Sequence, residues 1–163
     1  MIFGMPPFTF VHVLLSLIGI LAGLVVLNGF FASKRLPGWT LVFLVTTIAT
    51  SVTGFFLPAD HLLPSHVVGI ISLVFLVIAV LALYSFRLAG AWRSTYVVAA
   101  TISLYLNVFV LVAQSFLKLP ALHALAPTQQ EPPFAIAQGV VLLIFIVLGV
   151  LAVKRFRPRR SGL

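Results

Sequence analysis

Five long apolar segments, each free of Asp, Glu, Lys and Arg, restrict this chain more than any other feature of its sequence. They cover residues 8–32, 39–57, 67–86, 95–116 and 134–153. A helix of about 20 such residues crosses the hydrocarbon core of a bilayer. Only 7% of the 163 residues are charged and 62% are hydrophobic, too few polar groups to cover a water-soluble globular domain. The sequence therefore predicts one all-α membrane domain over residues 1–163, a bundle of five transmembrane helices.

The charged residues are divided between the two sides of these segments. With five spans, the connections after the first, third and fifth segments lie on one side, and they carry nine of the ten basic residues: Lys34, Arg35, Arg87, Arg93, Lys154, Arg155, Arg157, Arg159 and Arg160. Only Lys118 falls on the other side. By the positive-inside rule the basic side is cytoplasmic, so we expect the N-terminus outside and the C-terminus inside. The pattern predicts a multi-pass protein of a bacterial inner membrane that contacts anionic lipid and does not bind nucleic acid.

The sequence contains no recognisable catalytic motif. It has no cysteine, which excludes disulfides, thiolate nucleophiles, iron–sulfur clusters and thioether-linked haem. It also lacks a standard metal-binding signature and a glycine-rich phosphate loop. We therefore expect a protein that is not an enzyme.

Small residues mark one face of the first segment. His12, Ser16, Gly19 and Gly23 are spaced so that they share one side of a helix. Small residues allow membrane helices to approach closely. The spacing predicts a helix contact at Gly19 and Gly23, with His12 directed into the bundle.

A polar stripe follows one face of the fourth segment. It consists of Tyr96, Ser103, Asn107 and Gln114. An unpaired amide in hydrocarbon is costly, so the stripe should face the bundle interior. We expect its partners in the threonine-rich second segment or at Gln138. It serves either as an interhelical contact or as the lining of a conduit or ligand groove.

His12, His66 and Glu131 lie near the ends of three segments on the N-terminal side. Two facing histidines at similar depth can ligate a b-type haem, and the carboxylate could accept a proton from a quinol. This cofactor hypothesis requires the first, third and fifth helices to be mutual neighbours. The alternative is that these histidines are ordinary hydrogen-bonding residues of the membrane interface.

Asp60, His61 and His123 lie in connections on the same side. Together with His66 they offer nitrogen and oxygen ligands for a divalent metal such as zinc or copper. Their spacing matches no known metal-binding signature, so a metal site here is a hypothesis based on ligand chemistry alone.

Three functions remain open from the sequence. The first is a non-catalytic accessory, assembly or scaffold subunit that binds other membrane proteins or a second copy of itself. The second is a redox or metal-binding module built on the histidines. The third is a small oligomeric transporter or channel that uses the polar faces of the second and fourth helices.

Overall fold

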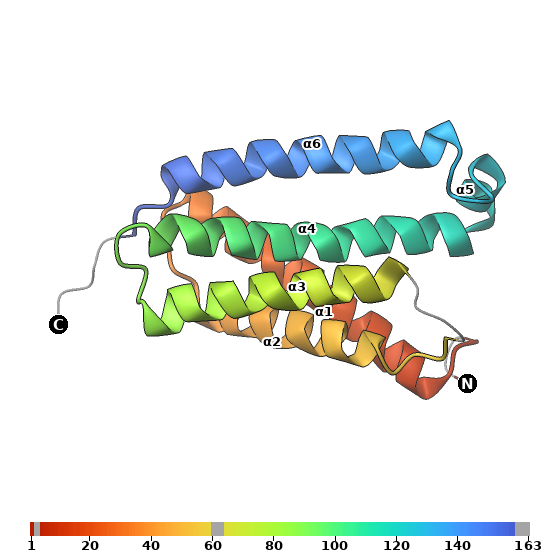
Figure 1. Cartoon of the computed structure of the whole chain (residues 1–163), viewed down its shortest axis with the longest axis horizontal. Helices are drawn as coiled ribbons and strands as arrows, with labels where there is room; N and C mark the ends of the chain where they lie inside the picture. The colour runs from red at the N-terminus through yellow and green to blue at the C-terminus, as the bar shows by residue number, and fades with distance from the viewer. Residues whose placement is uncertain (2–3, 60–63, 159–163) are drawn as a thin grey trace.

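A computed structural model of the chain describes residue 1 and residues 4–59 and 64–158. All the regular elements in these ranges are helices, except for one isolated bridge residue (Figure 1). The elements are α1 (Pro7–Phe31), α2 (Pro37–Gly54), α3 (Pro64–Val80) with its π-helical continuation η1 (Leu81–Ser85), α4 (Trp92–Lys118), α5 (Pro120–Leu125) and α6 (Pro132–Arg155). Five helices of this part of the chain are long and apolar enough to cross a membrane, which makes it a small multi-pass membrane protein.

Proline sets the start of most of these helices. Every α-helix except α4 begins at a proline, whose fixed φ and missing N–H suit the first helical position. For this reason α2, α3 and α6 begin two or three residues earlier than the apolar pattern predicts. At its other end α2 stops at Gly54, so Phe55, Phe56 and Leu57 form a turn and not a last helical turn.

The first four long helices form a ring in which α1 packs on α2, α2 on α3, α3 on α4 and α4 on α1. Helix α6 lies outside this ring, against α4 and to a smaller extent against α1 (Figure 1). Helix α3 makes no extensive contact with α6 or α1 in the described part of the chain. The expectation that the first, third and fifth spans are mutual neighbours is therefore wrong.

The two ends of the bundle differ in charge and packing. One end, here called the basic end, carries the α1–α2 and α3–α4 connections and the C-terminal end of α6, whereas the start of α1 and the short helix α5 lie at the opposite, N-terminal end (Figure 1). The largest buried apolar side chains, including Phe43, Leu76, Val97 and Leu104, lie in the half near the basic end. The solid core of the bundle therefore occupies one half of its length.

Contacts between helix ends close the basic end. The Arg93 guanidinium donates hydrogen bonds to the backbone carbonyls of Val153 (3.1 Å) and Phe156. Phe156 is 1% exposed, and its ring packs against Phe30 with 4.8 Å between ring centroids. The N–H of Arg157 donates to Ser33 Oγ at 2.8 Å. These contacts hold the end of α6 against α1 and α4.

Candidate binding cavity

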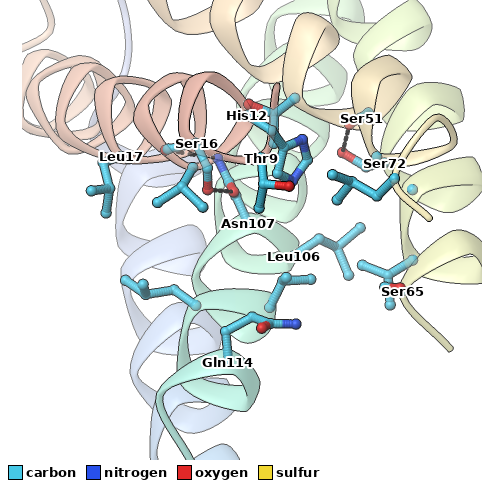
Figure 2. Close-up of a pocket in the computed structure, with 18 of the residues that line it drawn as sticks. Thr9, His12, Ser16, Leu17, Ser51, Ser65, Ser72, Leu106, Asn107 and Gln114 are labelled. Carbon is cyan, nitrogen blue, oxygen red and sulfur yellow. Dashed lines mark hydrogen bonds between the residues drawn. The ribbon is translucent and has the colours of Figure 1, made fainter. Parts of the chain in front are cut away.

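A cavity of about 570 Å³ occupies the N-terminal half of the four-helix ring (Figure 2). Side chains of α1, α2, α3 and α4 line it, and it is partly open to its surroundings. Its lining on α4 runs from Leu106 to Lys118, which corresponds to a depth of about 18 Å at 1.5 Å per helical residue. The cavity therefore extends from the end of the bundle to near the middle of its length.

Paired polar side chains lie at the deep end of the cavity. Ser16 Oγ donates to Asn107 Oδ1 at 2.8 Å, and Asn107 Nδ2 donates to the Ser16 carbonyl at 3.4 Å. Ser51 Oγ donates to Ser72 Oγ at 3.3 Å, which connects α2 to α3 (Figure 2). These bonds satisfy amide and hydroxyl groups that would otherwise be costly in the middle of a membrane.

Gly19 and Gly23 lie where α1, α2 and α4 meet, next to this deep end. A Cβ added at Gly19 would lie 3.0 Å from Thr47 Oγ1 and 3.3 Å from Asn107 Nδ2. A Cβ added at Gly23 would lie only 2.6 Å from Leu104 Cδ1. Both glycines thus face neighbouring helices and not lipid, and their small size brings α1 close enough for Ser16 to reach Asn107.

The predicted polar stripe divides between the two halves of the bundle. Tyr96 packs against Phe30 near the basic end, with 5.5 Å between ring centroids, and Ser103 donates to its own helix at the Ala99 carbonyl. Asn107 and Gln114 line the cavity. The stripe is therefore not one continuous groove.

The partner of Asn107 is Ser16 of α1, not one of the threonines of α2. Gln138 does reach α4, but its amide donates to the Phe109 carbonyl at 3.1 Å and not to a stripe side chain. These two partners differ from those that the sequence suggested.

His12 lines the cavity from α1 and is half-buried. Its Nδ1 lies 2.8 Å from Thr53 Oγ1 on α2. The Thr53 hydroxyl in turn donates to the Ala49 carbonyl of its own helix at 2.7 Å. The ring edge packs against Gly54, where an added Cβ would be in ordinary van der Waals contact with His12 Cε1, at 3.5 Å.

His66 lines the same cavity from α3. Its ring stacks on Phe55, with 5.7 Å between centroids and 15° between the ring planes. The structure therefore places two of the three residues of the cofactor hypothesis, His12 and His66, on the wall of a common cavity.

Glu131, the third residue of that hypothesis, does not line the cavity. Its carboxylate accepts hydrogen bonds from the Thr128 hydroxyl (2.9 Å) and from the backbone N–H groups of Thr128 and Gln130. Partial desolvation opposes ionisation of this carboxyl, but the hydrogen bonds outweigh it and lower the pKa of Glu131. Glu131 thus organises the turn before α6, and the structure does not place it beside the two histidines.

The proposed metal ligands are not brought together in the described part of the chain. His123 lies exposed on α5, and Asp60 and His61 fall outside the described residues. Within residues 4–59 and 64–158, no group of three or more His, Asp or Glu side chains is arranged to hold a metal ion.

Several cavity residues were not singled out from the sequence as site residues. They are Phe55, Ser72 and Lys118, together with Ser16 in its role as the partner of Asn107; Thr53 does not line the cavity itself but contacts His12, which does. The unusual position of Lys118 on the side with few basic residues was the one available signal for it. Among the described lining residues it is the only Lys or Arg, and none is a carboxylate.

No protein-family model matches the chain. The searches of curated proteins and of solved structures likewise return no match to it. What can be said of the function therefore comes from the geometry of the cavity.

Proposed function

We propose that this protein is a membrane-embedded binding protein that holds an amphipathic small molecule in the cavity between α1, α2, α3 and α4. The observation that carries the proposal is the cavity itself. Ligand sites in proteins are concave spaces of about 300–1,000 Å³ with mostly apolar walls and a few placed polar groups. Here the cavity measures about 570 Å³, whereas the other half of the bundle holds the largest buried apolar side chains and a smaller pocket of about 200 Å³.

The distribution of side chains in the cavity favours an amphipathic ligand. Apolar side chains such as Val13, Val68 and Val110 form much of the wall. Polar groups are concentrated at a few points, including His12 and Asn107. A hydrocarbon portion of the ligand would contact the first set, and a polar group of the ligand would meet the second.

We further propose the orientation with the N-terminus outside, in a bacterial inner membrane. The support is the charge difference between the two ends of the bundle, since Lys118 is the one described basic side chain away from the basic end. In this orientation the cavity opens on the outer side of the membrane.

The alternatives from the sequence have less support. A channel needs a continuous path, but buried Phe43, Leu76 and Leu104 fill the bundle beyond the deep end of the cavity. The haem hypothesis keeps its two histidines but loses Glu131. The accessory-subunit hypothesis predicts a stable partner that purifies with the chain, and it stays a prediction.

Two glycine substitutions provide a matched test of the cavity. Gly69 lines the cavity on α3, and a Cβ there would lie 3.4 Å from the ring of Phe55, another lining residue, so Gly69→Phe would crowd this part of the cavity. Gly139 on α6 has no atom within 4 Å of an added Cβ, so Gly139→Phe is the control for a bulky residue on a helix away from the cavity. Binding of para-octylphenol to each protein in lipid nanodiscs would be measured as a function of its mole fraction in the lipid. We expect wild type and Gly139→Phe to bind the probe saturably, and Gly69→Phe to bind it at least about tenfold more weakly.

Far-UV circular dichroism and gel filtration would establish that both variants are folded. Absence of saturable binding to wild type, or equal binding by the two folded variants, would contradict the proposed function.

A further inference from the structure

We infer that the ligand of this cavity carries a hydroxyl group that donates a hydrogen bond to Nε2 of His12. This inference rests on the proposed function and specifies the class of ligand: a phenol or an alcohol with an apolar tail. It follows from which acceptors the protons of Thr53, His12 and the lining hydroxyls are hydrogen-bonded to.

The first step concerns Thr53, whose hydroxyl has one proton. Thr53 Oγ1 lies 2.7 Å from the Ala49 carbonyl and 3.2 Å from the Thr50 carbonyl, both of which can only accept. Back-bonding of this kind, to a carbonyl one turn earlier, is the usual arrangement of a threonine in a membrane helix. The proton is therefore used within α2, and Thr53 Oγ1 is left as an acceptor.

The second step concerns the tautomer of His12. Since Thr53 Oγ1 is an acceptor, the 2.8 Å contact with His12 Nδ1 requires a proton on Nδ1. No carboxylate among the described lining residues balances a charged imidazolium, and the neutral ring then has its lone pair on Nε2. Nε2 has no hydrogen-bond partner among the residues that the structure describes. A ligand that reaches it must therefore bring a donor.

The third step concerns the remaining hydroxyls of the wall. Four of them donate their protons inside the protein: Ser16 to Asn107 Oδ1, Thr50 to the Thr46 carbonyl, Ser51 to Ser72 Oγ and Ser115 to the Leu111 carbonyl. What these groups leave for the cavity is oxygen lone pairs. The lining also carries donors, in the amide of Gln114 and the ammonium group of Lys118, so it is His12 Nε2 that sets the requirement for a donating ligand.

The first experiment measures the tautomer directly, without a ligand. Ring-nitrogen NMR shifts of histidine-labelled protein in nanodiscs distinguish a protonated Nδ1 from a protonated Nε2, and a His12→Phe variant assigns the signal. We expect Nδ1 protonated in wild type, and a shift toward the Nε2-protonated form in Thr53→Val, which removes the acceptor while keeping the shape of the side chain. A protonated Nε2 in wild type would overturn the inference.

The second experiment compares para-octylphenol with its methyl ether, para-octylanisole, which keeps the shape but cannot donate. We expect wild type to bind the phenol about fivefold more tightly than the ether, the effect of one net hydrogen bond. The His12→Phe variant should bind both probes equally, whereas His66→Phe should keep the preference. Equal binding of the two probes by wild type, or loss of the preference only in His66→Phe, would contradict the inference.

These outcomes separate the inference from the proposed function. If neither probe binds wild type, the proposed function fails. If both bind wild type equally and Gly69→Phe weakens both, the cavity is a binding site but the requirement for a donor at His12 is wrong.

Discussion

The close contact at Gly23 gives the sharpest prediction about stability. In Gly23→Ala the new Cβ would lie 2.6 Å from Leu104 Cδ1 and 3.0 Å from two ring carbons of Phe43. Carbon atoms in contact are normally about 3.5–4.0 Å apart, so these side chains must move by about 1 Å. Leu104 is 2% exposed and Phe43 is 1% exposed, so both must move within the buried core and not into solvent or lipid. We therefore expect alanine to destabilise the bundle at this position.

The magnitude follows from two opposing effects. Overpacking a well-packed core costs about 1–3 kcal/mol. Replacing glycine by alanine within a helix gains up to about 1 kcal/mol through helix propensity. Gly139→Ala makes the same helix substitution with no atom within 4 Å, so it isolates the second effect. The free energy of unfolding of Gly23→Ala should therefore be lower than that of Gly139→Ala by about 1–3 kcal/mol.

Unfolding in mixed micelles with increasing sodium dodecyl sulfate, followed by circular dichroism, would measure this difference. The Leu104→Ala background supplies a double-mutant cycle: it removes the atom nearest to the new Cβ, so the cost of Gly23→Ala should shrink there. If Gly23→Ala and Gly139→Ala agree within about 0.5 kcal/mol, or if Leu104→Ala leaves the cost unchanged, the packing argument is refuted.

Three further predictions concern the ends of the bundle. Replacing Arg93 by Gln removes charge-assisted hydrogen bonds to carbonyls at the end of α6 and should destabilise that end of the bundle by about 1.5–3 kcal/mol. Trypsin should then cleave the chain after α6 faster in Arg93→Gln than in wild type. Equal cleavage rates would contradict this prediction. The carboxylate of Glu131 has a lowered pKa in the folded protein, so the order that it gives the preceding turn is present above the ordinary pKa of a glutamate. The turn loses that order as the pH falls through the lowered pKa of Glu131, because the protonated carboxyl no longer holds the Thr128 N–H. The rate of hydrogen exchange at the Thr128 amide, corrected for intrinsic exchange, should therefore rise over that pH range in wild type. It should show no such pH-dependent rise in Glu131→Gln. Reporter fusions at Lys34 and after residue 158 should report the cytoplasm and a fusion at Thr128 the outside, and one contrary result would refute the proposed orientation.

The apolar pattern predicted the spans well because the bilayer imposes a length and a composition that can be read from the sequence without tertiary contacts. Each of the five spans begins and ends within three residues of its predicted limits. The largest differences, of three residues, are at Pro64 and Trp92, where α3 and α4 begin early, and at Gly54, where α2 ends early. The inward face of Gly19 and Gly23 was also predictable, because helical spacing places small residues on one side before any partner is known.

The site was only partly predictable. Spacing placed Asn107 on an interior face, but its partner, Ser16, lies ninety-one positions away in the chain and was not identified. Helical periodicity says which residues share a face of one helix, whereas the choice of neighbouring helix depends on how all five pack. The assumption that α3 and α6 are neighbours failed for this reason, and with it the placement of Glu131 beside the histidines.

The sequence by itself therefore determined that this protein lies in a membrane, the number of its candidate membrane-spanning helices and which end is basic, because hydropathy and charge act on each segment separately. Only the tertiary structure decided that the larger cavity lies in one half of the bundle and the largest buried apolar side chains in the other. That difference depends on side-chain volumes summed over four helices, such as Phe43 and Leu104 filling the space beside Gly23. The same packing holds His12 Nδ1 against Thr53, forty-one positions further along the chain, and places His12 on the wall of the cavity.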